Sequence, residues 1–232
     1  MSVSSVSTDP FRGVCNGCPA ERRDVFESLV RGGKGACAFP CASVSARATL
    51  PDRWFDLYGF AFVRRGILIR QCVDENGVTT ALDAAGAGAL VALDRSDDRI
   101  ASAGYAVSDL LVCLYPRTVL DTVVENGGQL VRELMTLQAQ AAARLDAFSH
   151  ARAQPNAVNA AGALLLALAD TLSPPKMTAV IPSSLQQRDM AALLGLRHET
   201  VCRAVAQLVS RGALQRDTEG FRIVDRALLT AA

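Results

Sequence analysis

The residues best suited to chemistry in this sequence are cysteines, of which it has seven. Cys15 and Cys18 stand in the stretch CNGCP, and this C-x-x-C spacing lets two thiolates bind one metal centre. Cys37 and Cys41 follow in ACAFPC, and Cys113 stands alone in LLVCLYP. These five residues predict a metal or redox site.

A second group of reactive side chains lies in the stretch LRHETVCRAV, on the first two turns of a predicted helix. An arginine binds guanine through two hydrogen bonds, a glutamate accepts from the amino group of cytosine, and a threonine at a helix N-terminus suits a phosphate. The stretch therefore predicts contacts with double-stranded DNA. The predicted DNA-binding residues are Arg197, His198, Glu199, Thr200 and Arg203.

The elements that would position this second group form a helix, a tight turn and a second helix. Apolar residues recur at helical spacing on both sides of Gly195, which permits the turn. The stretch GALQRDTEGFRIV then predicts two short strands around a turn at 217–220, as in a wing. This order is typical of a winged helix-turn-helix, in which the N-terminal residues of the second helix reach the base edges.

The first half of the chain has the pattern of a compact β domain. Between residue 36 and about residue 116, runs such as WFDLYGFAFV and GILIRQCV are strand-like. Turn signals recur at Pro51-Asp52, Arg65-Gly66 and Glu75-Asn76-Gly77. Because helices do not alternate with these strands, we expect a barrel or sandwich rather than a parallel sheet.

A long helix is predicted from Val119 to about Ala153. Its apolar residues form a narrow stripe, which favours pairing with a second copy of the chain as in a coiled coil. The alternative is that the stripe packs on the chain's own β domain. The predicted dimerisation residues are Leu130, Leu134, Leu137, Ala141, Leu145 and Phe148.

Composition narrows the class of protein. The chain has 232 residues, is 50% hydrophobic and carries a net charge of +1, so any DNA-binding surface must be a local patch. We expect a cytoplasmic protein without a membrane span, because neither a secretory signal nor about 18 consecutive apolar residues is present. The sequence has no Gly-rich phosphate loop, zinc-protease helix or nucleophile elbow, so we predict that it is not an enzyme.

Glu199-Thr200-Val201-Cys202-Arg203 resembles the Glu-Thr-Val-x-Arg recognition pattern of the CRP/FNR family of bacterial transcription regulators. The resemblance implies an α+β fold with three parts. These are a cysteine segment and sensory β-roll, like the jelly roll of cyclic-nucleotide-binding domains, in residues 1–118, a dimerisation helix in 119–154 and a winged helix-turn-helix in 155–232. It also implies a homodimer that binds a palindromic operator and contacts RNA polymerase.

The family resemblance also bears on the signal. Members that bind cyclic AMP hold its phosphate with a Gly-Glu pair and an Arg-Ser pair. Here the corresponding stretch lacks the glutamate, and Arg99 is followed by Ile100, so we expect no cyclic AMP site.

Cys113 is similar in place to the single central ligand of the oxygen-sensing FNR branch, which binds a [4Fe-4S] cluster. The resemblance implies a cluster held by Cys15, Cys18, Cys113 and one of Cys37 or Cys41. A fourth ligand other than cysteine, and buried inert cysteines without any cluster, stay open, and so do three other functions. They are thiol–disulfide sensing by the same residues, a small-molecule or haem ligand in the β-roll, and a dimeric redox or metal-binding module that does not bind DNA.

Overall fold

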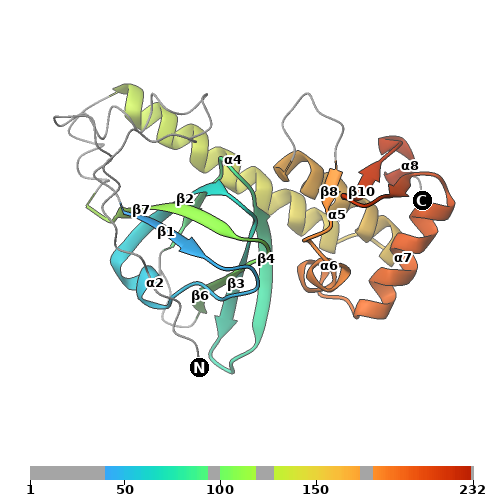
Figure 1. Ribbon diagram of the computed structural model, residues 1–232, viewed down its shortest axis with the longest axis horizontal. Coiled ribbons are helices and arrows are strands. Elements are labelled where there is room, and N and C mark those ends of the chain that lie inside the picture. The colour runs from blue at the N-terminus through green and yellow to red at the C-terminus, as the bar shows by residue number, and fades with distance from the viewer. Residues whose placement is uncertain (1–39, 94–99, 119–127, 173–179, 231–232) are drawn as a thin grey trace. The chain divides into compact units, whose positions relative to one another are not determined.

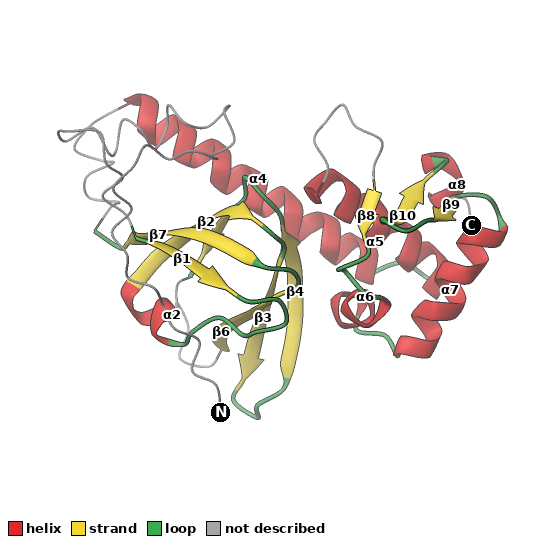
Figure 2. Ribbon diagram, in the orientation of Figure 1, coloured by secondary structure: helices red, strands yellow, loops and turns green. Residues whose placement is uncertain are grey.

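The computed structural model describes residues 40–93, 100–118, 128–172 and 180–230 (Figures 1 and 2). The chain divides into two compact units. One comprises Met1–Leu68 with Ala85–Ala141, and the other comprises Ile69–Ala84 with Ala142–Ala232. The division into three consecutive parts that the sequence predicts, at 1–118, 119–154 and 155–232, stays a prediction.

An antiparallel sheet of four strands forms the centre of the first unit, in the order β1-β7-β2-β5. The strands are β1 (Cys41–Val44), β7 (Leu110–Pro116), β2 (Tyr58–Arg65) and β5 (Leu90–Ala92), and the unit also contains β6 (Ile100–Ala106). Fifteen buried residues, from Ala42 to Leu114, form the main core. The N-terminal part of the chain is therefore a β domain, as the sequence predicts.

A short helix, α2 (Arg53–Leu57), replaces the first part of one predicted strand. The backbone N–H groups of Trp54 and Phe55 bond to the carbonyl oxygens of Pro51 and Asp52, which turns the chain. Trp54 and Phe55 are both buried in the main core. Adjacent residues of a strand point to opposite faces, so one helical turn buries both aromatic rings where a strand would bury one. The strand prediction for WFDL was wrong for this reason.

The second unit begins with the strands β3 (Leu68–Asp74) and β4 (Thr79–Ala85), which are joined by the predicted turn at Glu75-Asn76-Gly77. The carboxylate of Asp74 accepts hydrogen bonds from the N–H groups of Asn76 and Val78 and fixes this turn. On β4, the side chain of Asp83 is completely buried. It accepts from Arg70 Nε and Arg144 Nε, both at 2.7 Å. A buried carboxylate with two arginine partners therefore joins this hairpin to the long helix.

The long helix is α4 (Gly128–Arg152), whose end agrees with the prediction. At that end, Arg152 donates hydrogen bonds to the carbonyl oxygens of Ala81, Leu82 and Leu193, at 2.9 to 3.1 Å. The helix α5 (Ala157–Leu172) follows. Its first N–H groups bond to the side chain of Asn156, which ends the break between the two helices.

Two of the predicted dimerisation residues are buried by the chain's own residues. Leu137 is buried against Phe60, Phe62 and Tyr115 of the sheet, and Phe148 is fully buried within the chain. At these two positions the chain itself covers part of the stripe, which is the alternative that the sequence left open, and their role in dimerisation stays a prediction. Leu134, Ala141 and Leu145 are half-buried, and the side chain of Leu130 lies outside the described residues. For these four the prediction stays open.

The C-terminal elements are α6 (Gln187–Leu194), α7 (His198–Ser210) and α8 (Arg226–Thr230), with the strands β8 (Val180–Pro182), β9 (Leu214–Arg216) and β10 (Gly220–Ile223). The strands form a small antiparallel sheet in the order β8-β10-β9, one strand more than predicted. Gly220 has a φ of 142°, and a β-carbon there would lie 2.0 Å from the carbonyl oxygen of Ile181. Only glycine fits this approach of β10 to β8.

The order of these elements confirms the predicted α+β class: an antiparallel β domain, a long helix and a winged helix-turn-helix. Within the described residues, no helix combines the length and the hydropathy that a bilayer-spanning segment requires.

Candidate DNA-binding interface and cysteine pair

The turn between α6 and α7 is built by backbone geometry. Gly195 ends α6 in the left-handed region, with φ 66° and ψ 27°, which costs a residue with a side chain more than it costs glycine. The N–H of Leu196 bonds to the carbonyl oxygen of Ala191. At the other end of α6, Gln186 and Asp189 form a reciprocal capping box. Both ends of the first helix are thus fixed by local contacts, and they set where α7 begins.

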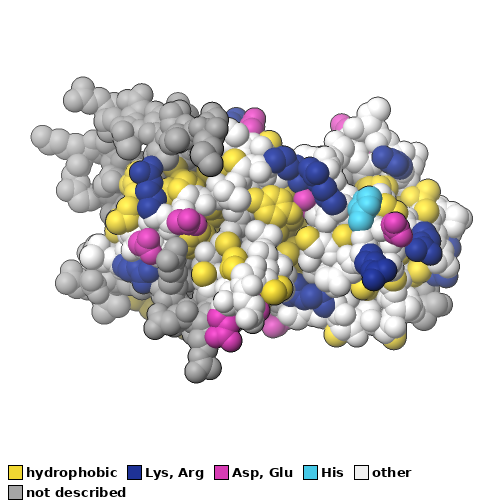
Figure 3. All heavy atoms as spheres, turned by 90° about the horizontal axis from the view of Figure 1, so that it is seen from below, with side chains coloured by type: hydrophobic (Ala, Val, Ile, Leu, Met, Phe, Trp, Pro, Cys, Tyr) yellow, Lys and Arg dark blue, Asp and Glu magenta, His cyan; other side chains and the backbone are white. Residues whose placement is uncertain are grey.

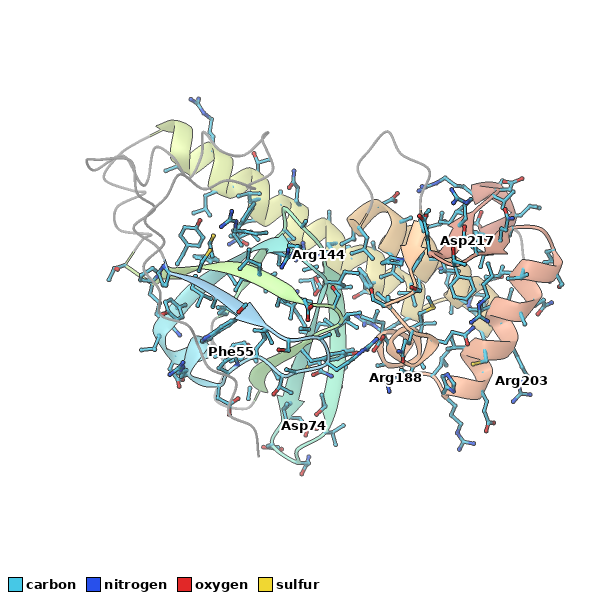
Figure 4. The ribbon with its side chains drawn as sticks, in the orientation of Figure 1. Phe55, Asp74, Arg144, Arg188, Arg203 and Asp217 are labelled. Carbon is cyan, nitrogen blue, oxygen red and sulfur yellow. The ribbon has the colours of Figure 1, made fainter. Side chains whose placement is uncertain are left out.

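The second helix, α7, has one buried face and one exposed face. Val201, Ala204, Val205 and Leu208 are buried, which anchors the helix to the domain. On the opposite face, the side chains of Glu199 and Arg203 are 84% and 80% exposed. Arg203 Nη2 lies 4.0 Å from Glu199 Oε2, a surface pair that is weak enough to give way to a base. Figure 4 shows Arg203 on α7. Both residues that were predicted to contact bases therefore lie on the same exposed face of α7.

The three remaining predicted DNA-binding residues lie at the N-terminus of α7. Arg197 is the residue before its first turn, His198 begins the helix, and both are exposed. Thr200 is half-buried. His198 also contacts Cys202, whose sulfur lies 3.4 Å from the imidazole Nε2 and donates to Gln187 of α6 at 3.0 Å. Cys202 therefore helps to hold α6 against α7.

A hollow of about 610 Å³ opens beside the N-termini of α6 and α7. It is lined by the first residues of both helices and by the turn between β9 and β10. The carboxylate of Asp217 accepts from the N–H groups of Glu219 and Gly220, which shapes this turn. Arg188 of α6 and Arg216 of β9 bring positive charge to the hollow. Helix N-termini and arginines together suit the phosphates of a DNA backbone.

Two of the predicted metal-site cysteines meet in the first unit. Cys41 and Cys113 are direct partners in the antiparallel pair β1–β7, and their sulfur atoms lie 3.4 Å apart. Arg64, from β2, is 8% exposed and donates to the sulfur of Cys41 at 3.3 Å. Both cysteines belong to a cluster on the side of the sheet where Leu134 and Leu137 of α4 pack. The spacing in sequence is 72 residues, so the strand register alone brings them together.

This environment favours a thiolate at Cys41. Its hydrogen bond with Cys113 and the neighbouring guanidinium of Arg64 lower the pKa of Cys41 to about 6, although partial burial acts in the opposite direction. Cys15, Cys18 and Cys37 lie outside the described residues. Among the residues that the structure describes, no three His, Cys, Asp or Glu side chains form a group that could hold a metal ion. The described part of the predicted site is thus a pair of thiols beside one arginine.

Comparison with known families settles the nature of the C-terminal domain. Residues 162–232 match the model of the Crp-like helix-turn-helix domain. These residues form a Crp-like helix-turn-helix domain. A search of curated proteins finds no match for the chain.

Solved structures show the same fold over most of the chain. FixK2 from Bradyrhizobium japonicum is 20% identical with a TM-score of 0.66, and the match covers 84% of this chain and 98% of FixK2. A CooA mutant from Carboxydothermus hydrogenoformans is 17% identical with a TM-score of 0.62, covering 82% and 86%. A CRP/FNR-family transcriptional regulator from Thermus thermophilus is 19% identical with a TM-score of 0.54, covering 82% and 95%. At these identities the likeness shows the fold alone.

Three residues of the candidate sites were not predicted from the sequence. In the Crp-like domain, Arg188 and Arg216 flank the hollow, and their basic charge was the only available signal. Figure 3 shows arginine side chains, in dark blue, on one face of this domain, in keeping with a local patch on a chain of nearly zero net charge. In the first unit, Arg64 reaches the thiol pair from a neighbouring strand. No sequence pattern connects it with Cys41.

Proposed function

We propose that this protein is a homodimeric, sequence-specific DNA-binding transcription regulator of the CRP/FNR type. The observation that carries the proposal is the exposed face of α7, where Glu199 and Arg203 project from a helix whose other face is buried in a Crp-like domain. In such a domain the second helix enters the major groove, and its first turns reach the base edges.

Each predicted residue has a role in this proposal. Arg203 donates two hydrogen bonds to a guanine, and Glu199 accepts from a cytosine amino group. Arg197 and His198 contact neighbouring bases, and Thr200 contacts a phosphate. The hollow beside α6 adds Arg188 and Arg216 as further phosphate contacts, which hold the domain on the duplex without reading its sequence.

The proposed dimer forms along α4. On the face that the chain leaves open, Met135 is 67% exposed, and Ala139 and Ala142 follow at helical spacing and are also exposed. Small residues let two helices approach closely, and Met135 offers an apolar contact. A two-fold dimer would place two α7 helices against half-sites about one DNA turn apart, which accounts for a palindromic operator. RNA polymerase is the further partner that this class of regulator implies.

We infer that the signal is a change in redox state, received by the cysteines. A [4Fe-4S] cluster is one candidate, and it would supply a group that oxygen or nitric oxide destroys. Cys41 and Cys113 fit poorly as two ligands of one such cluster, because each ligand binds a different iron and sulfur atoms in contact leave no room for this. The candidate cluster therefore draws on Cys15, Cys18, Cys37 and Cys113. Stoichiometric iron and sulfide in protein purified without oxygen, with an absorption that bleaches in air, would support it, and iron-free protein would contradict it.

The test of the proposed function is selection from a pool of random DNA duplexes by the full-length protein. We expect a two-fold-symmetric sequence to be enriched by the wild type and by Arg211→Ala, and we expect Arg203→Ala to enrich a sequence in which one position of each half-site is no longer specified. Arg211 is the matched control because it lies at the far end of the same helix, beyond the turns that reach the bases. A folded, dimeric wild type that enriches no sequence would instead indicate a redox module that does not bind DNA.

A further inference from the structure

The contact between Cys41 and Cys113 has the geometry of a cross-strand disulfide in its reduced form. The N–H of Leu114 bonds to the carbonyl oxygen of Pro40, which makes the opposed residues Cys41 and Cys113 a non-hydrogen-bonded pair of the antiparallel ladder. In such pairs the α-carbons lie about 4.5 Å apart, inside the range of about 4.4 to 6.8 Å that disulfides span. The sulfur atoms, at 3.4 Å, must approach by about 1.4 Å to reach bonding distance.

The position of β1 allows this approach, and Cys41 is the more accessible of the two sulfurs. Among the strands that the structure describes, β1 lies at the edge of its sheet, so it can shift without breaking a ladder with any of them on its other side. Cys41 is half-buried and Cys113 is buried, which makes Cys41 the sulfur that a small oxidant reaches first. Arg64 Nη1 donates a hydrogen bond to the Cys41 sulfur at 3.3 Å, which holds this sulfur next to that of Cys113.

We propose that Cys41 and Cys113 are an oxidation site at which a hydroperoxide forms a disulfide between β1 and β7, beneath α4. The inference rests on the proposed function only for its regulatory consequence. In the first step, the Cys41 thiolate attacks one peroxide oxygen, the O–O bond breaks, and the leaving alkoxide or hydroxide takes up a proton, which leaves a sulfenic acid. In the second step, the Cys113 thiol attacks that sulfur, the S–O bond breaks and water leaves. In sum, two thiols and one hydroperoxide give a disulfide, water and an alcohol or a second water.

The position of the pair connects this chemistry to the proposed dimer helix. Cys113 is packed in one cluster with Phe60, Phe62 and Leu137, and Cys41 and Leu134 lie at its margin. Leu134 and Leu137 belong to α4, so a bond that draws β1 toward β7 changes the surface on which α4 packs. Because packed clusters have discrete arrangements, such a change can bias the position of a helix.

The test uses full-length protein purified under reducing, anaerobic conditions and assayed for iron before it is treated with one equivalent of hydrogen peroxide. Mass spectrometry of a non-reducing digest should find Cys41 and Cys113 in one linked peptide pair, which dithiothreitol separates. Cys72→Ser, at another half-buried cysteine, should behave like the wild type. Cys41→Ser and Cys113→Ala should form no such link. Both variants are used so that the test still works if one of them fails to fold. The proposal would be overturned if other cysteines are linked in place of this pair, if the cysteines are oxidised only to sulfinic acid, or if bound iron protects Cys113.

DNA affinity is measured on the same samples, and it separates the two claims. Oxidation should change the affinity of the wild type by about fivefold or more and leave Cys41→Ser unchanged. If reduced protein binds DNA and no link forms, the oxidation site is wrong and the proposed function stands. If the link forms and neither sample binds DNA, the site stands and the proposed function is wrong. If the link forms and the affinity of DNA-binding protein does not change, the proposed connection to α4 is refuted.

Discussion

Replacing Asp83 by asparagine tests how the hairpin β3–β4 is held in its unit. The Asp83 side chain has no exposed surface, whereas Arg70 and Arg144 keep only 16% and 8% of theirs. Asparagine keeps the shape of the side chain but removes the negative charge to which both nearly buried guanidinium groups bond. Breaking a buried ion pair by removing one partner costs about 3 to 5 kcal/mol. The free energy of unfolding should fall by that amount, which corresponds to a drop in Tm of about 6 °C or more.

The assay is urea and thermal unfolding followed by circular dichroism. Asp170→Asn is the matched control, because Asp170 pairs with Arg226 at 2.8 Å with both side chains more than half exposed. An exposed pair contributes at most about 1 kcal/mol. If Asp83→Asn and Asp170→Asn destabilise the protein equally, Asp83 does not hold the hairpin as the structure indicates.

Three further predictions concern the pH dependence of stability, the binding of DNA and the dimer. Burial alone would raise the pKa of Asp83, but Arg70 and Arg144 outweigh burial and lower that pKa. The contribution of Asp83 to stability is therefore present above the unfolded pKa of about 4 and is lost as the pH falls below that value. Acid unfolding of the wild type should show this loss, and acid unfolding of Asp83→Asn should not. Arg216→Ala should weaken binding to all DNA sequences alike and reduce the slope of log affinity against log salt by about one, and an altered sequence preference would contradict its phosphate role. Met135→Lys should shift the protein from dimer to monomer in sedimentation, with no loss of helix content, and an unchanged dimer would exclude this face of α4.

Much of the Crp-like domain could be predicted from the sequence because its determinants are local. Gly195, the apolar spacing on either side of it and the polar first turns of α7 lie within about two dozen residues. The elements there follow from rules of helix capping and amphipathicity. The third strand of the wing, β8, was missed because, unlike β9 and β10, it is not joined to its neighbour by a short turn: it pairs with β10 across the two helices between them.

The cysteine pair could be predicted only in part. The sequence singles out Cys41 and Cys113, but their contact depends on the register of β1 against β7, which no local pattern specifies. Arg64 was missed for the same reason. The apolar stripe on α4 predicts a buried face correctly, but it does not say whether the sheet or a second copy covers it. Leu137 and Phe148 show that the chain itself covers part of it.

The central claim is that the first turns of α7 read base pairs. The most direct test measures wild type, Glu199→Ala and Arg203→Ala against the selected operator and against operators with each base pair of a half-site changed in turn. Each variant should lose discrimination at one position per half-site, worth about 1 to 3 kcal/mol, and keep it at the others. If both variants discriminate at every position as the wild type does, α7 is not the element that reads the sequence.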